Sequence, residues 1–135
     1  MEKDHLKAVG LKITTPRMRI LDFLSSSSDR HLSAEDIYQH LREIDKDISV
    51  ATIYRVLTQF ETAGLVIRHN FSEGYSVFEL NQGCHHDHLV CIQCRRVIEF
   101  HDPVIEERQD ALTEKVGFKA TDHSLTIYGI CQDCQ

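Results

Sequence analysis

Hydrophobic residues recur at helical spacing near the start of the chain. Met18, Leu21 and Leu24 fall on one face of a segment that opens with Thr15 and Pro16. A threonine beside a proline is typical of a helix N-terminus, because threonine caps backbone N–H groups there and proline has none to satisfy. The sequence therefore predicts a helix with Thr15 as its N-cap.

A second helical pattern follows a serine-rich break. Ser33 and Asp36 have the spacing of a capping box, in which two side chains and two backbone N–H groups bond reciprocally. Ile37, Leu41 and Ile44 then recur at helical spacing. We expect all three on the buried face of one helix.

A third helix and a hairpin complete this half of the chain. The helix is expected to begin after Ser49 and to end at Gly64, with its inward positions at Ile53, Val56, Leu57 and Phe60. Two β-prone segments, Leu65–Phe71 and Tyr75–Leu80, are joined by the turn residues Ser72-Glu73-Gly74. This order is typical of a winged helix-turn-helix, although a helical domain with an added hairpin has the same pattern.

The second half of the chain, beyond Asn81–Gly83, mixes strands with one helix. Strands are expected at Asp87–Cys91 and Val97–Phe100, and Phe118–Ile130 is expected to end in another. A helix is expected at Val104–Val116, and its inward positions are Ile105, Leu112 and Val116. A unit of about 50 residues has too small a core to be stable without a metal or a partner.

Composition places the chain among soluble globular proteins, because 41% of its residues are hydrophobic and 27% are charged. No apolar stretch approaches the roughly 20 residues of a membrane span. Met1–Lys12 also lacks the apolar core of an export signal, so we expect a cytoplasmic protein without a membrane partner. With a net charge of −6, any contact with nucleic acid requires a local basic face.

Four of the five cysteines form two Cys-x-x-Cys pairs, Cys91 with Cys94 and Cys131 with Cys134. An odd count in a chain without an export signal disfavours a disulfide framework. Four thiolates suit tetrahedral Zn²⁺, and such a site is structural because no coordination position stays open. Redox-active dithiols are the alternative interpretation. Cys84 is left without a role.

The segment from Cys84 to His88 holds three histidines and an aspartate in succession. On a strand, His86 and His88 share one face, while His85 and Asp87 share the other. One strand can therefore supply two sites with mixed nitrogen and oxygen ligands, which suit Fe²⁺, Mn²⁺ or Zn²⁺. Further ligands are available at His31, Glu79, Glu99, Glu106 and His123. A solvated polar strand without metal is the alternative.

A metallohydrolase is the catalytic alternative, because histidine and glutamate sites also catalyse hydrolysis. The chain has no His-Glu-x-x-His motif, no nucleophile elbow and no phosphate-binding glycine loop. We therefore expect neither an enzymatic activity nor a small organic substrate.

Several segments together resemble one known family, the ferric uptake regulators. The resemblance covers nearly the whole chain and is carried by Gly10–Thr14, Ala51–Leu57, Val77–Leu80, His85–Cys91 and Val97–Phe100. It implies an α+β fold, in which an N-terminal winged helix-turn-helix precedes a small α/β dimerisation domain with a four-cysteine zinc site. The implied boundaries are 1–80 for the DNA-binding domain, 81–84 for the hinge and 85–135 for the metal-binding dimerisation domain.

The resemblance also implies how DNA is recognised. The helix Ser49–Ala63 would enter the major groove of an AT-rich inverted repeat. On it, Tyr54 would contact a thymine methyl group and Arg55 would hydrogen-bond to base edges or phosphate. Lys12 would reach an adjacent minor groove, and Thr52 belongs to the same set. From the pattern alone, Tyr54 is a half-buried residue and Arg55 a solvated surface charge.

The resemblance further implies three metal sites. The structural zinc ligands are Cys91, Cys94, Cys131 and Cys134. The sensing-site ligands are His31, Glu79, His86, His88 and Glu99, and those of a second site are His85, Asp87, Glu106 and His123. These two sets match the two faces inferred from strand alternation. Cys84 departs from the family, since relatives often carry histidine there.

The function implied is a homodimeric, Fe²⁺-responsive transcriptional repressor of iron homeostasis genes, with tetramer formation left open. Mn²⁺, Co²⁺ or Zn²⁺ would replace Fe²⁺ in the sensing site, since affinity alone does not select iron. Zinc-uptake and peroxide-sensing regulators are alternatives within the family. Glu79 and Glu99 favour the iron branch, because peroxide-sensing relatives tend to carry aspartate there. A zinc-stabilised protein-interaction module is the alternative of a different class.

Overall fold

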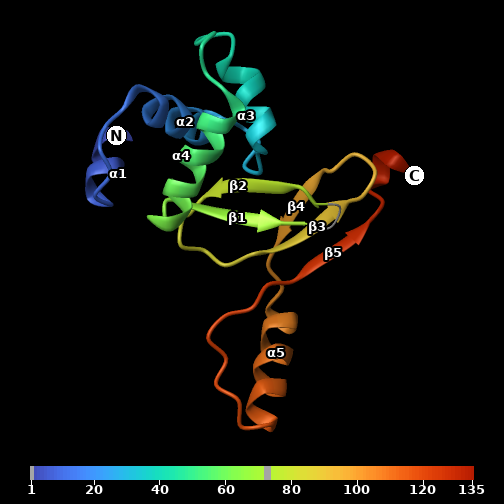
Figure 1. Ribbon diagram of the computed structural model, residues 1–135. Coiled ribbons are helices and arrows are strands. Elements are labelled where there is room, and N and C mark those ends of the chain that lie inside the picture. Colours follow the sequence, from blue (N-terminus) through green and yellow to red (C-terminus); the bar gives the residue numbers. More distant parts are fainter. Residues whose placement is uncertain (1, 72–73) are drawn as a thin grey trace. The chain divides into compact units, whose positions relative to one another are not determined.

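The computed structural model describes residues 2–71 and 74–135 (Figure 1). The chain divides into two compact units, residues 1–82 (unit 1) and 83–135 (unit 2). Among the helices described, none is long and apolar enough to cross a membrane.

In its described residues, unit 1 has four helices followed by an antiparallel hairpin. The elements are α1 (Glu2–Ala8), α2 (Thr15–Ser26), α3 (Ala34–Leu41), α4 (Val50–Thr62), β1 (Val66–Asn70) and β2 (Ser76–Leu80). This order confirms the winged helix-turn-helix, with α1 added. The sequence pattern missed α1 because this short helix buries a single residue, Leu6. Ser72 and Glu73 of the expected turn lie outside the described residues.

The core of unit 1 is formed by the helices and by the side of the hairpin that they cover. Every inward position expected on α4 is buried, and Phe60 in its last turn is fully buried. Phe78 on β2 is also fully buried, and its backbone pairs with Leu32 through N–H···O bonds of 2.8 and 3.1 Å. This pairing fixes the segment before α3 against β2 and so brings the neighbours of Leu32 and Phe78 together.

Two local expectations in unit 1 are wrong. The N-cap of α2 is Thr14, not Thr15: Thr14 Oγ1 accepts the Arg17 N–H at 3.3 Å. Ile44 is 59% exposed, because α3 ends at Leu41. The N–H groups of Ile44 and Asp45 both return to the Leu41 carbonyl, at 3.0 and 2.8 Å, so the chain turns there and leaves the helical face. The capping box of Ser33 with Asp36 and the end of α4 at Gly64 (φ +80°) are as expected.

Unit 2 is a three-stranded sheet with one helix. It comprises β3 (Asp87–Cys91), β4 (Val97–Phe100), α5 (Pro103–Lys115), β5 (Thr126–Gly129) and a 3-10 turn at Gln132–Cys134. The strand order is β4-β3-β5, with β3 antiparallel to β4 and parallel to β5. Because Cys91 lies opposite Gly129 in the parallel pair, the chain end is brought back beside the first Cys-x-x-Cys pair.

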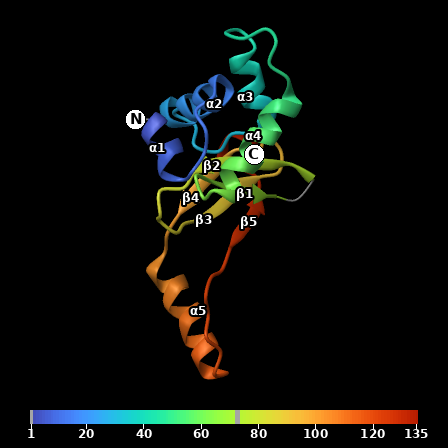
Figure 2. The same cartoon turned by 60° about the vertical axis from the view of Figure 1, so that its left-hand side comes forward.

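The expectation that α5 buries one face is wrong for the single chain. None of its residues is buried, Leu112 is 49% exposed and Val116, just past its end, is 75% exposed. Both views show the helix extending away from the sheet of its own unit (Figures 1 and 2). The apolar residues of α5 therefore have no core to enter within unit 2. Among the hydrophobic residues described there, Val90 and Cys91 alone are buried.

Candidate metal centres and nucleic-acid interface

The four paired cysteines meet at one end of the sheet in unit 2. Their sulfur atoms all lie within 4.8 Å of one another, and Cys94 Sγ and Cys131 Sγ are 3.7 Å apart. Zinc–sulfur bonds of about 2.3 Å in tetrahedral geometry place sulfur atoms roughly 3.8 Å apart. Cys91, Cys94, Cys131 and Cys134 therefore fit a zinc ion with little rearrangement.

The pKa values of the thiols in this cluster also favour a bound cation. The N–H groups of Cys131 and Cys94 donate to Cys91 Sγ at 3.4 and 3.5 Å and lower the pKa of Cys91 to about 6. Hydrogen bonding to the Cys131 sulfur raises the pKa of Cys134 to about 12. The thiolate of Cys91 is therefore stabilised, whereas Cys134 holds its proton tightly. Four thiolates at this spacing require a positive ion between them.

A second cluster lies elsewhere in unit 2 and joins three parts of its chain. His85 Nε2 is 3.2 Å from Asp87 Oδ1 and 3.5 Å from Glu106 Oε1. His123 Nε2 lies 3.7 Å from the same Asp87 oxygen and 3.4 Å from the same Glu106 oxygen. These are the four residues predicted for the second site, gathered from β3 and the segment before it, α5, and the loop before β5.

Burial supports a cation at this second cluster. Asp87 is fully buried, yet neither of its carboxylate oxygens accepts a hydrogen bond from any described residue. A buried carboxylate without donors is costly unless a positive charge compensates it. The donor set, two imidazoles and two carboxylates, fits a divalent transition ion.

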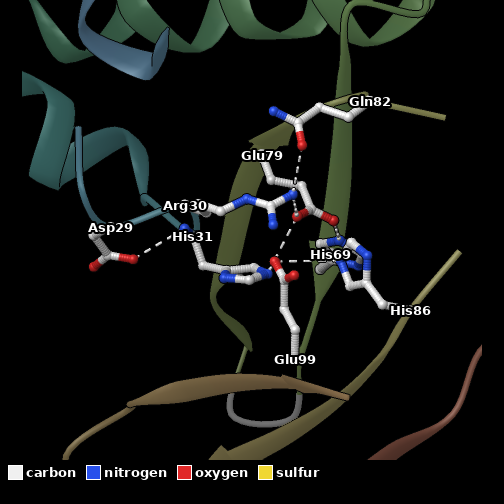
Figure 3. Close-up of polar contacts among 8 residues, drawn as sticks. All are labelled: Asp29, Arg30, His31, His69, Glu79, Gln82, His86 and Glu99. Carbon is white, nitrogen blue, oxygen red and sulfur yellow. Dashed lines mark hydrogen bonds and ion pairs between the residues drawn. The ribbon is translucent and has the colours of Figure 1, made fainter. Parts of the chain in front are cut away.

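The five residues predicted for the sensing site are divided between the units. In unit 1, His31 Nε2 lies 3.4 Å from Glu79 Oε2 (Figure 3). The Leu32–Phe78 pairing explains this contact, because each residue is the direct neighbour of one paired residue. In unit 2, His86 Nε2 lies 3.4 Å from Glu99 Oε1, and His88 is directly opposite Glu99 in the β3–β4 register. Each unit thus carries a group of the expected ligands.

The sequence analysis missed one residue of this region, His69 on β1. Its Nε2 lies 2.7 Å from Glu79 Oε1, the shortest of the contacts drawn around that carboxylate (Figure 3). Glu79 is opposite Ile67 in the hairpin, and His69 is two residues further along the same strand face. A hairpin register assigned from the sequence would have placed His69 diagonally across from Glu79.

The predicted DNA-binding residues gather on unit 1. Lys12, Thr52 and Arg55 line one hollow of about 310 Å³, together with Arg17 and Gln59. Arg17 donates to the Lys12 carbonyl at 2.8 Å and to Gln59 Oε1 at 2.9 Å, which ties the segment before α2 to α4. Three of the residues that line this hollow, Lys12, Arg17 and Arg55, are basic, so we refer to it as the basic hollow.

Tyr54 does not line this hollow. It is half-buried against the core of unit 1, and its hydroxyl donates to Glu35 Oε1 at 3.2 Å. Burial, together with the negative charge of Glu35, raises the pKa of Tyr54. This position agrees with the half-buried tyrosine expected from the sequence pattern. A contact between Tyr54 and DNA would have to be made by the part of the side chain that stays exposed.

Comparison with known proteins identifies the family. The sequence model of the ferric uptake regulator family matches residues 8–128. The chain belongs to the ferric uptake regulator family. The ferric uptake regulation protein of Legionella pneumophila is 60% identical over 134 residues, which cover 99% of this chain and 98% of that protein.

Solved structures of the family have the same fold. The ferric uptake regulator of Vibrio cholerae superimposes with a TM-score of 0.90 at 49% identity, covering 97% of this chain and 100% of that one. The regulator of Francisella tularensis, determined with iron, has a TM-score of 0.88 at 41% identity and covers 93% and 95% of the two chains. The predicted α+β fold, with a cluster of four cysteines suited to zinc, is therefore confirmed. Members of this family are transcriptional regulators, and this chain, as a member, is one.

Proposed function

We propose that this protein is an Fe²⁺-responsive repressor that binds an AT-rich palindromic operator as a homodimer and controls iron homeostasis genes. Family membership and the basic hollow on unit 1 support a role in DNA binding. The observation that carries the metal response is the division of the expected ligands. His31 and Glu79 meet in unit 1, whereas His86, His88 and Glu99 gather in unit 2.

A ligand set divided in this way provides a switch. A first-row divalent ion supplies a positive charge that binds imidazole nitrogens and carboxylate oxygens from both units at once. An arrangement of the units that unites the ligands is then favoured over arrangements that separate them. Shifting such an equilibrium from 1:99 to 99:1 requires about 5.5 kcal/mol of differential binding. We propose that the favoured arrangement sets the two recognition helices of a dimer at the spacing of one operator.

The two remaining metal clusters have different proposed roles. The four-cysteine cluster holds structural zinc, because four thiolates leave no open position. His85, Asp87, Glu106 and His123 form a second site that stabilises unit 2. Dimerisation is proposed for unit 2 because its sheet, its helix and the segment after the helix expose a series of large apolar residues: Leu89, Ile98, Val104, Leu112, Val116, Phe118 and Ile127.

Operator binding tests the proposal directly. We expect zinc-loaded protein to bind a fluorescently labelled AT-rich palindromic duplex more tightly with Mn²⁺, or with Fe²⁺ under anaerobic conditions, than without added metal. A coupling of the usual size for allosteric proteins gives a gain of roughly 5- to 150-fold. Anisotropy at fixed salt measures it. Equal affinity in all conditions would reject the metal switch, and no binding of a folded dimer to any of a library of duplexes would favour a protein-interaction module.

Arg55→Ala tests the DNA interface separately. Arg55 is exposed on α4 and lines the basic hollow, so removal of its guanidinium deletes donors to base edges or phosphate. We expect a loss of about 1–3 kcal/mol in operator binding, or roughly 5- to 150-fold in affinity, with unchanged thermal stability. Arg108→Ala, an exposed arginine of unit 2, is the matched control. If Arg55→Ala binds operator as tightly as the control does, the proposed contact of Arg55 with DNA is wrong.

A further inference from the structure

We propose that unit 1 carries a metal site of its own, formed by His31, His69 and Glu79, at which a divalent transition ion first binds. The set contains two imidazoles and one carboxylate, all from unit 1, whose ligand atoms lie within 4.8 Å of one another. The existence of this site does not depend on the proposed metal switch. Its role as the place where the ion first binds does rest on that proposed function.

The Glu79 carboxylate is placed to serve as the centre of this site. Its Oε1 is 2.7 Å from His69 Nε2, and its Oε2 is 3.4 Å from His31 Nε2. Metal–ligand bonds of about 2.1 Å separate neighbouring ligand atoms by roughly 3.0–3.4 Å. The two contacts of Glu79 differ from this range by no more than a few tenths of an ångström. The two imidazoles, whose ligand atoms lie within 4.8 Å of each other, move together when an ion binds. The Glu79 side chain is 1% exposed, and a buried carboxylate surrounded by imidazoles is a strong acceptor for a cation.

Backbone pairing holds the three residues together without any metal. His31 is adjacent to Leu32, which pairs with Phe78 next to Glu79. His69 lies on β1, whose five-residue register with β2 is continuous from Val66 to Asn70. The ligands therefore come from elements of one packed unit, and the site is preorganised as ligand sites on rigid elements must be.

This ligand set overlaps the proposed sensing set without being identical to it. His31 and Glu79 belong to both sets, whereas His69 belongs to this one alone. Three protein ligands leave coordination positions open, and two histidines with one carboxylate suit Fe²⁺. An ion held by unit 1 can therefore accept further ligands from unit 2.

A nearby positive charge opposes the binding of a cation at this site. Arg30 Nη2 lies 3.9 Å from Glu79 Oε2 and also donates to Gln82 Oε1 at 3.2 Å. A guanidinium at this distance competes with a cation for the carboxylate. Weak binding by three ligands, rather than tight retention, is what a first binding step requires.

A rival role for His69 is to orient Glu79 through a hydrogen bond, as outer residues of metal sites commonly do. Two substitutions separate the roles. Glutamine retains an N–H that can donate to Glu79 but is a poor ligand for transition ions, whereas alanine removes both properties. A ligand role predicts equal losses for His69→Gln and His69→Ala, and an orienting role predicts rescue by His69→Gln.

The test uses the full chain, with its cysteine site loaded with zinc and with His86→Ala, His88→Ala and Glu99→Ala combined to remove the unit 2 ligands of the sensing set. The second site stays intact in every variant, so it contributes the same Co²⁺ equivalent throughout. Co²⁺ is the probe, because its visible absorption and its hyperfine-shifted imidazole proton resonances both report ligation. Equilibrium dialysis counts the Co²⁺ bound. His5→Gln, an exposed histidine on α1, is the matched control.

We expect the triple variant to retain a Co²⁺ equivalent that His69→Gln and His69→Ala each weaken at least 10-fold and His5→Gln leaves unchanged. A hyperfine-shifted imidazole resonance should disappear with either His69 substitution. Three results would each contradict the proposed site. They are restored Co²⁺ binding in His69→Gln, an unchanged Co²⁺ count in both His69 variants, and loss of this Co²⁺ equivalent already in the triple variant. None of these measurements involves operator DNA, so failure here is distinct from failure of the proposed switch.

Discussion

Cys131→Ser is expected to release zinc and to unfold residues 83–135 while unit 1 stays folded. Val90 and Cys91 are the buried hydrophobic residues described in unit 2, so apolar burial contributes little to its stability. Structural zinc contributes roughly 10–16 kcal/mol of apparent binding free energy at pH 7, against about 3–5 kcal/mol from a small core. The change should therefore exceed the whole stability of the unit.

Hydrogen exchange locates this effect within the chain. The amide of His88 donates to the Leu125 carbonyl at 3.1 Å, and that of Ile92 donates to Gly129 at 2.9 Å, so both report β3–β5 pairing. We expect these amides to lose protection in Cys131→Ser, while the Phe78 amide, bonded to Leu32 in unit 1, keeps it. Zinc content measured on the same samples should fall by one equivalent per chain.

Cys84→Ser is the matched control for this prediction. Cys84 is exposed and lies outside the four-cysteine cluster, so the same chemical change there should leave zinc content and exchange unaffected. If Cys131→Ser retained its zinc and the protection of β3 and β5, the cluster would not be the element that stabilises unit 2.

Glu79→Gln is expected to abolish most of the metal-dependent gain in operator affinity. The substitution preserves side-chain shape and a possible hydrogen bond with His69, but it removes the negative charge that His31, His69 and Arg30 surround. Substitution of residues that merely support ligands costs about 10- to 100-fold in metal affinity. Loss of a charged ligand should cost at least as much.

The measurement is operator anisotropy across a Mn²⁺ titration, with folding checked by thermal unfolding without metal. Glu43→Gln, on an exposed residue after α3, makes the same chemical change away from the site and should behave as the unsubstituted protein does. A Glu79→Gln variant with an unaltered Mn²⁺ titration would exclude Glu79 as a sensing ligand.

Local patterns in the sequence predicted local structure well. β3 and β4 begin and end at the predicted residues, and the inward face of α4 is as expected, because side-chain period follows directly from backbone geometry. Errors arose where the outcome depends on a neighbour in space. Ile44 has the right spacing for a helix that has already ended, and α5 has an apolar face that nothing in its own unit covers.

The predicted N-cap of α2 was wrong by one residue. Thr14 and Thr15 have the same side chain, and each precedes the proline closely enough to cap a helix. Thr14 is the cap because its backbone is extended and its hydroxyl meets the Arg17 N–H, and the alternative differs by a single residue of register. Sequence spacing alone cannot distinguish the two.

The sequence by itself determined the kinds of ligand available, the separation of His85 and Asp87 from His86 and His88, and the resemblance to one family. The tertiary structure decided which distant residues meet. The parallel pairing of β3 with β5 brings Cys131 to Cys94, 37 residues earlier in the chain, and the Leu32–Phe78 pairing brings His31 to Glu79. The hairpin register then adds His69, which no motif marked. The physical reason is that periodicity encodes a residue's own face of a helix or strand, whereas partners across a sheet depend on strand order and register, which only the packed chain sets.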